Sequence, residues 1–285
     1  MITLILGGGL GNQMFEYALY RKLESDGYDA AIDDYGLRKY GNQHNGLELE
    51  RVFGLKYRRV GSVRHAWNWA LMKSDAVLNR MHIYSDRIRL FERKEQIPYE
   101  AICSRKNRIL FGCWQSEDYF SDIAETIRKD FTFQGITKQN YSLAKTMKKE
   151  NSVSVHIRRG DYLLPENQKL FGGICTLEYY QKAISHIRNQ VSDCRFYIFS
   201  NDPIWVQENF SFLGYQLVDW NTGDDSYQDM YLMSQCRHHI IANSSFSWWG
   251  AWLGNAPDKI VVAPKQWLAD RDWNRVVPEG WERIA

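Results

Sequence analysis

The sequence has few cysteines, and their spacing is irregular. Only five of its 285 residues are cysteine, and no two of them form a C-x-x-C pair. An odd and scattered set is unsuited to a disulfide framework or to a zinc knuckle. A reducing cytosol is the simplest setting for such a protein.

A long hydrophobic run is also absent from the N-terminus. The opening segment, MITLILGGGLGNQ, has no basic region before its apolar residues, and glycine interrupts the apolar run after Leu6. A signal peptide or a membrane-spanning helix needs a longer run. We therefore expect this segment to form the first strand of the fold.

The sequence has no strong excess of charge of either sign. It holds 36 basic and 34 acidic residues, a formal net charge of +2, so no overall field attracts it to nucleic acid. Two local basic stretches, LKYRRVGSVRH and SRKNR, are most simply solvated faces, although contact with a membrane surface stays open. We predict no nucleic-acid partner.

Several catalytic motifs are missing. No H-E-x-x-H, P-loop, G-x-S-x-G or Cys/His pairing occurs, so metalloprotease, NTPase and hydrolase functions lose support. The pairs Asp33–Asp34 and Asp224–Asp225 do not form a D-x-D motif after a strand. A diphosphate held by a metal therefore has little support, and we predict no metal site.

What is present at the N-terminus is the pattern of a strand–helix–strand unit with a glycine-rich turn after the first strand. Gly27 predicts the end of the helix, and the helix has a regular apolar stripe. The stripe consists of Phe15, Ala18, Leu19 and Leu23. The middle of the chain is predicted to be helical and irregular, apart from a strand at RILFGCWQ and a helix that begins at Ser116.

From Ser152 onward the alternation is regular. Strands are predicted at VSVHI, RFYIFS, YQLVDW, HHIIAN and KIVVAP, the last in the chain, with helices between them, one starting from a capping box of Ser226 and Asp229. This alternation is typical of a doubly wound parallel sheet. We predict an α/β protein with two Rossmann-like domains facing across a cleft, spanning residues 1–140 and 141–285.

The glycine-rich turn is the first candidate site. Its backbone is bare where a strand meets a helix, and the amides at a helix start favour an anion. Asp33 and Asp34 follow at about the distance at which a dinucleotide site has its ribose-binding acidic residue. However, Asn12 stands where the G-x-G-x-x-G motif requires its third glycine. A sugar-nucleotide cleft is therefore the favoured interpretation, and a tight structural turn is the alternative.

The second candidate lies where the buried strand VSVHI ends. His156 and Arg158 share one face of the strand, Arg159 begins the turn, and Asp161 follows. Guanidinium groups match phosphate oxygens and can neutralise a leaving pyrophosphate without a metal. The alternative is an ordinary buried ion pair. An adhesion role for the RGD triplet requires an exposed loop, whereas this turn continues a buried strand.

The third candidate combines polar residues after two further strands. Asp202 follows one of them, and Ser244, Ser245 and Ser247 follow the other. Because the carboxyl ends of parallel strands meet at one edge, we expect these side chains near Arg158. Helix capping is the alternative for each residue singly.

Taken in order, four segments resemble the bacterial α-1,2-fucosyltransferases of glycosyltransferase family 11. They are GGLGNQMFEYA, VHIRRGDY, FYIFSND and ANSSFSWWGAWL. The resemblance covers nearly the whole chain. It implies a GT-B fold and an inverting transfer of L-fucose from GDP-β-L-fucose to a galactoside hydroxyl, with no cofactor or divalent metal.

The resemblance also implies roles for individual residues. Arg158 would bind the donor diphosphate and stabilise the departing GDP, with Arg159 and Asp161 supporting it. His156 and Asp202 would lie near guanosine. Ser245 and Ser247 would face the phosphates, and Gly9, Gly11, Asn12 and Gln13 would close over fucose. Charge grows on the leaving diphosphate, so donors fixed there lower the barrier most.

The base that would take the proton of the acceptor hydroxyl is not identified. Asp161 is expected to be tied to arginine, and Glu16, Asp33, Asp34 and His44 are candidates only because they lie in the other domain. A loose, oxocarbenium-like transition state would need little help from a base.

The favoured function is therefore a fucosyltransferase that builds a surface glycan or O-antigen in a bacterial cytoplasm. Its partners would be GDP-fucose and a galactose-terminated acceptor, with peripheral contact at the inner membrane left open. One alternative is a transferase for another GDP-sugar. A second is a non-catalytic sugar-binding protein, which has no use for a diphosphate clamp.

Overall fold

The computed structural model describes residues 1–40, 45–80, 89–92 and 96–285. The chain divides into two compact units, Met1–Gln134 and Gly135–Ala285. The domain boundary predicted after residue 140 falls inside helix α7 (Lys138–Met147). Thr137, the N-cap of this helix, accepts a hydrogen bond from the amide of Asn140. This helix therefore belongs as a whole to the second unit.

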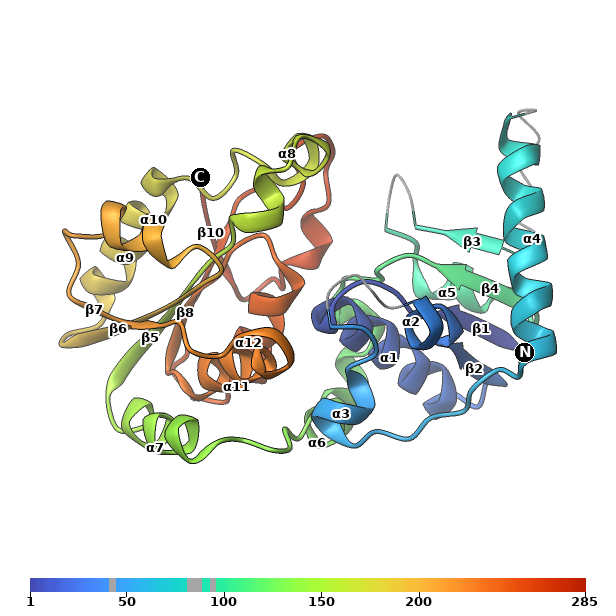
Figure 1. The fold of residues 1–285 in the computed structure, drawn as a ribbon, viewed down its shortest axis with the longest axis horizontal. Coiled ribbons are helices and arrows are strands. Elements are labelled where there is room, and N and C mark those ends of the chain that lie inside the picture. Colours follow the sequence, from blue (N-terminus) through green and yellow to red (C-terminus); the bar gives the residue numbers. More distant parts are fainter. Residues whose placement is uncertain (41–44, 81–88, 93–95) are drawn as a thin grey trace. The chain divides into compact units, whose positions relative to one another are not determined.

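Unit 1 is a four-stranded parallel sheet with helices around it (Figure 1). Its strands are β1 (Ile2–Ile5), β2 (Ala30–Asp33), β3 (Arg89–Phe91) and β4 (Arg108–Phe111). Its helices are α1 (Leu10–Ser25), α2 (Tyr35–Tyr40), α3 (Leu49–Phe53), α4 (Ser62–Arg80), α5 (Tyr99–Cys103) and α6 (Ala124–Asp130), with short 3₁₀ turns η1 (Glu117–Tyr119) and η2 (Ser121–Ile123). The sheet order is β2-β1-β4-β3, and every pairing is parallel.

The predicted strand–helix–strand unit is present as β1, α1 and β2. All four residues of the predicted apolar stripe on α1 are buried, which explains why this helix packs along the sheet. Gly27 follows the helix at a φ of +77°, a value that glycine adopts without strain. The local prediction is therefore confirmed from the first strand to the second.

The middle of unit 1 differs from the prediction in detail. Strand β4 matches the predicted strand but ends at Phe111, and the short strand β3 was not predicted. The helix expected from Ser116 is two 3₁₀ turns followed by α6, although Ser116 accepts the predicted capping bond from the amide of Asp118.

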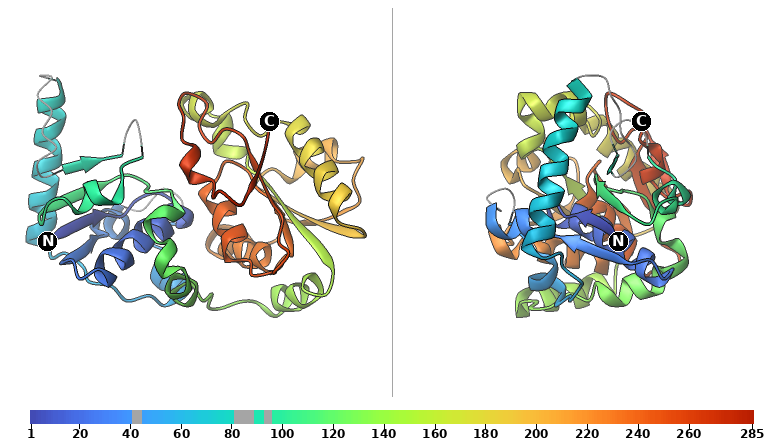
Figure 2. Two further views of the ribbon diagram at one scale, coloured as in Figure 1. Left: turned by 180° about the vertical axis from the view of Figure 1, so that it is seen from behind. Right: turned by 90° about the vertical axis from the view of Figure 1, so that its right-hand side faces the viewer.

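Unit 2 is a six-stranded parallel sheet with helices on both faces (Figures 1 and 2). Its strands are β5 (Asn151–Ile157), β6 (Cys194–Ser200), β7 (Tyr215–Val218), β8 (His238–Ile240), β9 (Val261–Pro264) and β10 (Glu282–Ile284). Its other elements are α7, α8 (Pro165–Phe171), α9 (Leu177–Gln190), α10 (Pro203–Asn209), α11 (Tyr227–Gln235), α12 (Ser245–Leu253) and the 3₁₀ turns η3 (Gly160–Leu163), η4 (Gly223–Asp225) and η5 (Asn274–Val276).

The strand order of unit 2 places β5 in the middle. The order is β10-β9-β8-β5-β6-β7, so the chain moves outward in one direction from β5 to β7 and then returns to the other side of β5 with β8. This is the Rossmann order, in which ligands bind beyond the carboxyl ends of the two strands where the direction reverses. The sheet thus predicts a site at the ends of β5 and β8.

The two faces of this sheet use alternate residues of β5. Val153, Val155 and Ile157 pack with α9 and α10 in one apolar core. The opposite face contacts α7 and α12: Ser152 donates to the carbonyl of Met147, and the His156 ring lies 5.8 Å from that of Phe246. Both faces of β5 are therefore buried, one with apolar residues and the other with the polar Ser152, Ser154 and His156.

Two expectations for unit 2 are wrong. Val261–Pro264 is not the last strand, because β10 pairs with it in parallel. Ser226 makes no capping hydrogen bond through its side chain, and Asp229 accepts from Asn221 instead. No helix within the described residues is long and apolar enough to cross a membrane.

Candidate functional site

Arg158 follows the last residue of β5, at the position where the sheet predicts a ligand. Its Nη2 lies 2.7 Å from Asp161 Oδ1, and both side chains are partly exposed. The ring centroid of Tyr162 lies 5.7 Å from the guanidinium carbon of Arg158. The Tyr162 hydroxyl donates a hydrogen bond to the carbonyl of Asn243, which follows β8. No other acidic side chain among the described residues pairs with Arg158, so part of its charge remains available.

Arg159 is held from the neighbouring strand. Its backbone amide donates to Asn201 Oδ1 at 2.9 Å, and its Nε donates to Asp202 Oδ2 at 3.0 Å. Its guanidinium carbon lies 4.1 Å from the ring centroid of Trp205, close enough for a cation–π contact. The end of β6 therefore fixes this arginine in place.

The turn after Arg159 packs closely against Asn201. A Cβ added to Gly160 would come within 2.3 Å of Asn201 Nδ2, so a larger residue would displace the Asn201 side chain that holds the amide of Arg159. Asn201, which the sequence interpretation passed over, is thus a positioning residue. The signal for it was its place directly before Asp202, at a strand end.

His156 is buried on β5, with only 6% of its surface exposed. Burial, and secondarily the charge of Arg158, lower its pKa to about 3. The ring is therefore neutral at physiological pH. It adds no charge to the site but keeps one donor and one acceptor nitrogen, which suits a nucleobase better than a phosphate.

Asp202 is the N-cap of α10. Its Oδ1 accepts from the amide of Trp205 at 3.1 Å, while Oδ2 binds Arg159. The capping alternative raised for this residue is thus present in the structure. Pro203 takes the first helical position as expected.

The serines after β8 have unequal positions. Ser245 is the partly exposed first residue of α12, whose preceding Ser244 makes no side-chain capping bond. Ser247 is fully buried, and its hydroxyl donates to the carbonyls of Ala242 and Ser244. The expectation that Ser247 faces phosphate is corrected on this ground, because its hydroxyl is used inside the fold. Ser245 keeps its proposed role.

Asn243, at the same edge, was not singled out from the sequence. Its side-chain amide donates to the carbonyls of Phe171 and Trp267, and its Oδ1 accepts from the Cys175 thiol. It therefore joins the loops around the carboxyl end of β8 and supports Tyr162 through its backbone carbonyl.

The glycine-rich turn lies at the carboxyl end of β1 in unit 1. Gly9 is the N-cap of α1 and makes no side-chain contact, and Gly11 is buried within the helix. Asn12 is partly exposed and accepts from Gln115 Nε2 at 2.8 Å. Gly8 has a φ of +68°, and a Cβ there would approach Asn12 Nδ2 to 2.6 Å. The side chain of Asn12 therefore lies against the backbone of Gly8.

Gln13 has a different role from the one expected. It is fully buried; its Nε2 donates to the carbonyls of Gly8 and Gly46, and its Oε1 accepts from the amide of Glu48. The whole amide is thus used to tie the turn to residues 46–48. The expectation that Gln13 contacts fucose is corrected, because no part of the side chain is left for a ligand.

Three of the four candidate bases are engaged by neighbours. Glu16 accepts from the amide of Gly7. Asp34 accepts from Arg38, Tyr57 and Arg59. Asp33 is buried and has three partners: His65 Nδ1 at 2.9 Å, Asn68 Nδ2 at 3.1 Å and the amide of Tyr35 at 3.4 Å. His44 lies outside the described residues.

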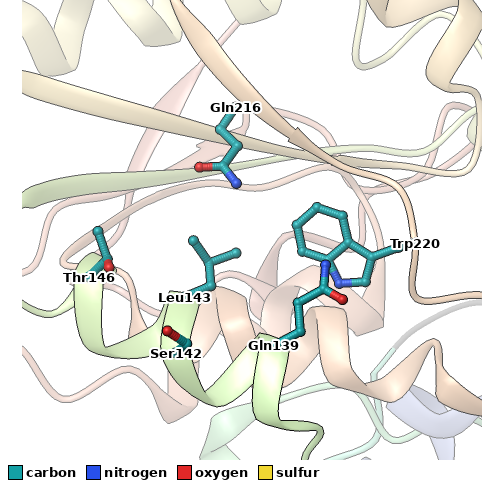
Figure 3. Close-up of a pocket in the computed structure, with 6 residues that line it drawn as sticks. All are labelled: Gln139, Ser142, Leu143, Thr146, Gln216 and Trp220. Atoms are coloured by element: carbon teal, nitrogen blue, oxygen red, sulfur yellow. The ribbon is translucent and has the colours of Figure 1, made fainter.

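A groove of about 390 Å³ lies outside this edge, between α7 and β7 in unit 2 (Figure 3). Gln216 and Trp220 line one side, and residues of α7 line the other. None of its lining side chains carries a charge, so the groove does not suit a diphosphate. None of the predicted site residues lines it.

The described part of the chain offers no preformed site for a metal ion. Within it, no cluster of three or more His, Cys, Asp or Glu side chains is arranged to hold an ion.

Comparison with known proteins identifies the family. The model of glycosyl transferase family 11 matches residues 70–284. An Escherichia coli alpha-1,2-colitosyltransferase is 35% identical to this chain, with 100% of this chain and 99% of the relative covered. The Escherichia coli O-antigen biosynthesis glycosyltransferase WbnK is 29% identical over 97% and 98% of the two chains. The chain belongs to glycosyltransferase family 11.

The predicted α/β fold class is confirmed, because each of the two units is built on a parallel, Rossmann-like sheet. Among solved structures, a NodZ alpha-1,6-fucosyltransferase soaked with GDP-fucose aligns with a TM-score of 0.49 at 15% identity. That alignment covers 92% of this chain and 94% of the other.

Proposed function

We propose that this protein transfers L-fucose from GDP-β-L-fucose to a galactoside hydroxyl, forming an α-1,2 linkage with inversion. The acceptor would be a galactose-terminated glycan of a surface polysaccharide or O-antigen, made in the bacterial cytoplasm or at the inner membrane. The O-antigen assignment is supported by the name of the relative WbnK. The linkage is supported by the name of the colitosyltransferase.

One observation carries this proposal: two arginines lie at the carboxyl end of the central strand, each with its own carboxylate partner. Asp161 pairs with Arg158, and Asp202 pairs with Arg159. Pairing fixes the guanidinium groups before a ligand arrives, so less conformational entropy is lost on binding. The partly exposed Ser245 at the start of α12 adds a hydroxyl near an N-terminus that favours phosphate.

The chemistry follows from where charge appears. As the bond between the anomeric carbon and phosphate oxygen breaks, its electron pair moves onto GDP. A fixed guanidinium stabilises that charge more in the transition state than in the bound donor, which lowers the barrier. Arg158 would perform this role, and neutral His156 would contact the guanine base.

The test is release of GDP from GDP-fucose in the presence of a galactoside acceptor and EDTA. Wild-type protein is expected to turn over with EDTA present. Arg158→Ala is expected to lower kcat by about 10³-fold, since it removes the group that faces the developing charge. Equal turnover in the mutant, or complete inhibition by EDTA, would contradict the proposed site.

A second donor is favoured by one specific observation, the 35% identity to an alpha-1,2-colitosyltransferase. Colitose is fucose without its 3-hydroxyl, so GDP-colitose would meet the same diphosphate clamp. A site that hydrogen-bonds the 3-hydroxyl rejects the sugar that lacks it far more strongly than an apolar pocket rejects the extra hydroxyl. The ratio of kcat/KM values for the two donors therefore separates these candidates.

A further inference from the structure

Helix α4, the long cyan helix of unit 1 in Figure 1, carries the exposed tryptophans of the described chain. Trp67 and Trp69 have 60% and 51% of their surface exposed, and Val63, one turn before Trp67, is 84% exposed. The other tryptophans are buried or partly buried. Large apolar side chains that gather on a surface mark a place where the protein contacts a partner or a membrane.

The face of α4 that packs on the rest of unit 1 is polar. His65 Nδ1 lies 2.9 Å from Asp33 Oδ1 at the end of β2, and Asn68 Nδ2 donates to Asp33 Oδ2 at 3.1 Å. The His65 ring also stacks on that of Tyr35 in α2, with the two centroids 4.0 Å apart. Residues three apart share one face of a helix. Hydrogen bonds to a buried carboxyl group therefore fix which side of α4 faces unit 1.

The opposite face of α4 is apolar and exposed. At 3.6 residues per turn, four positions lie opposite His65 and Asn68. All four are exposed, and together we call them the α4 stripe: Val63, Ala66, Trp67 and Ala70. A surface helix normally turns its apolar stripe toward the core and its polar face toward water. Helix α4 has the reverse arrangement, which contact with water alone does not favour.

Basic side chains flank the α4 stripe. Helical geometry places Arg64 on one side of it and Lys73 on the other. Lys73 Nζ lies 5.1 Å from the centroid of the Trp69 ring, within range of a cation–π contact. Residues 51–74 hold six basic residues and no acidic one. This part of the surface therefore favours a negatively charged occupant.

The combination of indoles, a short apolar stripe and flanking cations suits the surface of an anionic bilayer. Tryptophan is enriched at the level of the lipid headgroups. Interfacial helices turn apolar residues into the bilayer while their lysines and arginines meet anionic lipids. A second copy of the chain suits this face less well. In a twofold contact through α4, Arg64 and Lys73 would meet the same cations of the second copy and be repelled.

We propose that the α4 stripe, together with Trp69, Arg64 and Lys73, is a binding surface for an anionic phospholipid bilayer. The apolar side chains enter the headgroup region, and the two cations contact lipid phosphates. The contact is reversible, because one helix face buries much less apolar surface than a helix that spans the bilayer. The inference goes beyond the proposed function, since membrane binding through unit 1 needs neither GDP-fucose nor an acceptor.

The test is cosedimentation of the full chain with vesicles. Wild type should bind vesicles of equal parts phosphatidylcholine and phosphatidylglycerol about tenfold more tightly than vesicles of phosphatidylcholine alone. Added salt should reduce this difference. The double variant Trp67→Ser with Trp69→Ser should bind the anionic vesicles at least about tenfold more weakly than wild type. Both indoles are exposed, so the variant should fold as wild type does.

Unit 2 offers a matched control for the loss of an exposed aromatic ring. Tyr141 on α7 is 54% exposed, and Lys145 Nζ lies 4.5 Å from the centroid of its ring. This pair has the same contact as Trp69 and Lys73 but no apolar stripe beside it, because Lys138 lies one turn before Tyr141. Tyr141→Ser should leave the affinity for anionic vesicles unchanged.

A charge reversal tests the flanking cations separately. Lys73→Glu keeps both indoles but places an anion beside the α4 stripe. Binding to the anionic vesicles should fall by about tenfold, while binding to phosphatidylcholine vesicles should stay the same. Lys145→Glu on α7 is the matched control and should behave as wild type with both kinds of vesicle.

Acrylamide quenching reports whether the indoles enter the bilayer. Anionic vesicles should protect part of the wild-type tryptophan fluorescence from acrylamide, and the double variant should show no such protection. Failure of wild type to bind anionic vesicles, or equal binding by the double variant, would overturn the inference. So would a wild-type dimer that becomes a monomer in the double variant and binds no vesicles, since a second copy would then cover the face. GDP release is measured without vesicles, so failure of the proposed function is seen separately.

Discussion

The carboxyl edges of the two sheets carry opposite chemistry. In unit 2 the edge presents two arginines, each paired with a carboxylate and partly exposed. In unit 1 the edge presents a glycine-rich turn and two carboxyl groups, Glu16 on α1 and Glu92 after β3, whose pKa values are raised by burial. Two sheets of the same parallel type thus differ mainly in the side chains that follow their strands.

The difference decides which ligands each edge suits. Guanidinium groups match phosphate oxygens and stay charged, whereas buried carboxyl groups favour their protonated, uncharged form. The comparison therefore predicts that substitutions of the arginines alter donor chemistry, whereas substitutions in the glycine-rich turn first alter the stability of unit 1.

Among the substitutions that test this comparison, Arg158→Lys is expected to have the largest effect on activity. Lysine keeps the positive charge but loses the planar forked donors. We expect kcat to fall by about 10- to 100-fold, equivalent to one charge-assisted hydrogen bond. Steady-state kinetics with GDP-fucose, compared with Arg158→Ala, measure how much of the effect comes from geometry. If the Arg158→Lys variant and wild type turned over equally, charge alone would suffice.

A smaller effect is expected for Gly8→Ala at the edge of unit 1. Alanine at a φ of +68° is strained, and its Cβ would come within 2.6 Å of Asn12 Nδ2. We expect a loss of about 1–2 kcal/mol, seen as a lower midpoint of denaturant unfolding, and a higher KM for the donor. Gly36→Ala is the control, because Gly36 has open space around it. An equal loss of stability in Gly36→Ala would show that the effect is not specific to the glycine-rich turn.

The smallest change in stability is expected for Asp202→Asn. Asparagine caps a helix about as well as aspartate, and a partly exposed ion pair contributes about 0–1 kcal/mol. Unfolding should therefore change little, while KM for GDP-fucose rises several-fold if Asp202 contacts the donor. Asp258→Asn removes the partner of exposed Arg237 and should leave KM unchanged. If Asp202→Asn leaves the KM for the donor unchanged, Asp202 serves only as the N-cap of α10.

The strands and the arginine site of unit 2 were accessible from the sequence because their signals are local. Alternating β-branched residues mark β5, and Asp202 followed by proline marks the start of α10. The parallel alternation then brings the ends of β5, β6 and β8 to one edge. This reasoning needs no knowledge of distant contacts.

The parts that the sequence did not predict depend on contacts between distant segments. The side-chain amide of Gln13 is hydrogen-bonded to the backbone of Gly46 and Glu48. No pattern around residue 13 indicates these contacts. Ser247 differs from Ser245 only in the face of α12 on which it lies. Strand β3 has three residues, too few for a periodic pattern, so it was not predicted.

The close packing of Gly112 on Glu92 has a consequence for how this family member can change over time. A Cβ at residue 112 would lie 2.6 Å from the Cβ of Glu92, and every residue except glycine carries a Cβ. No ordinary exchange at residue 92 therefore makes room for a side chain at 112. Sequence variation at 92 should leave residue 112 a glycine.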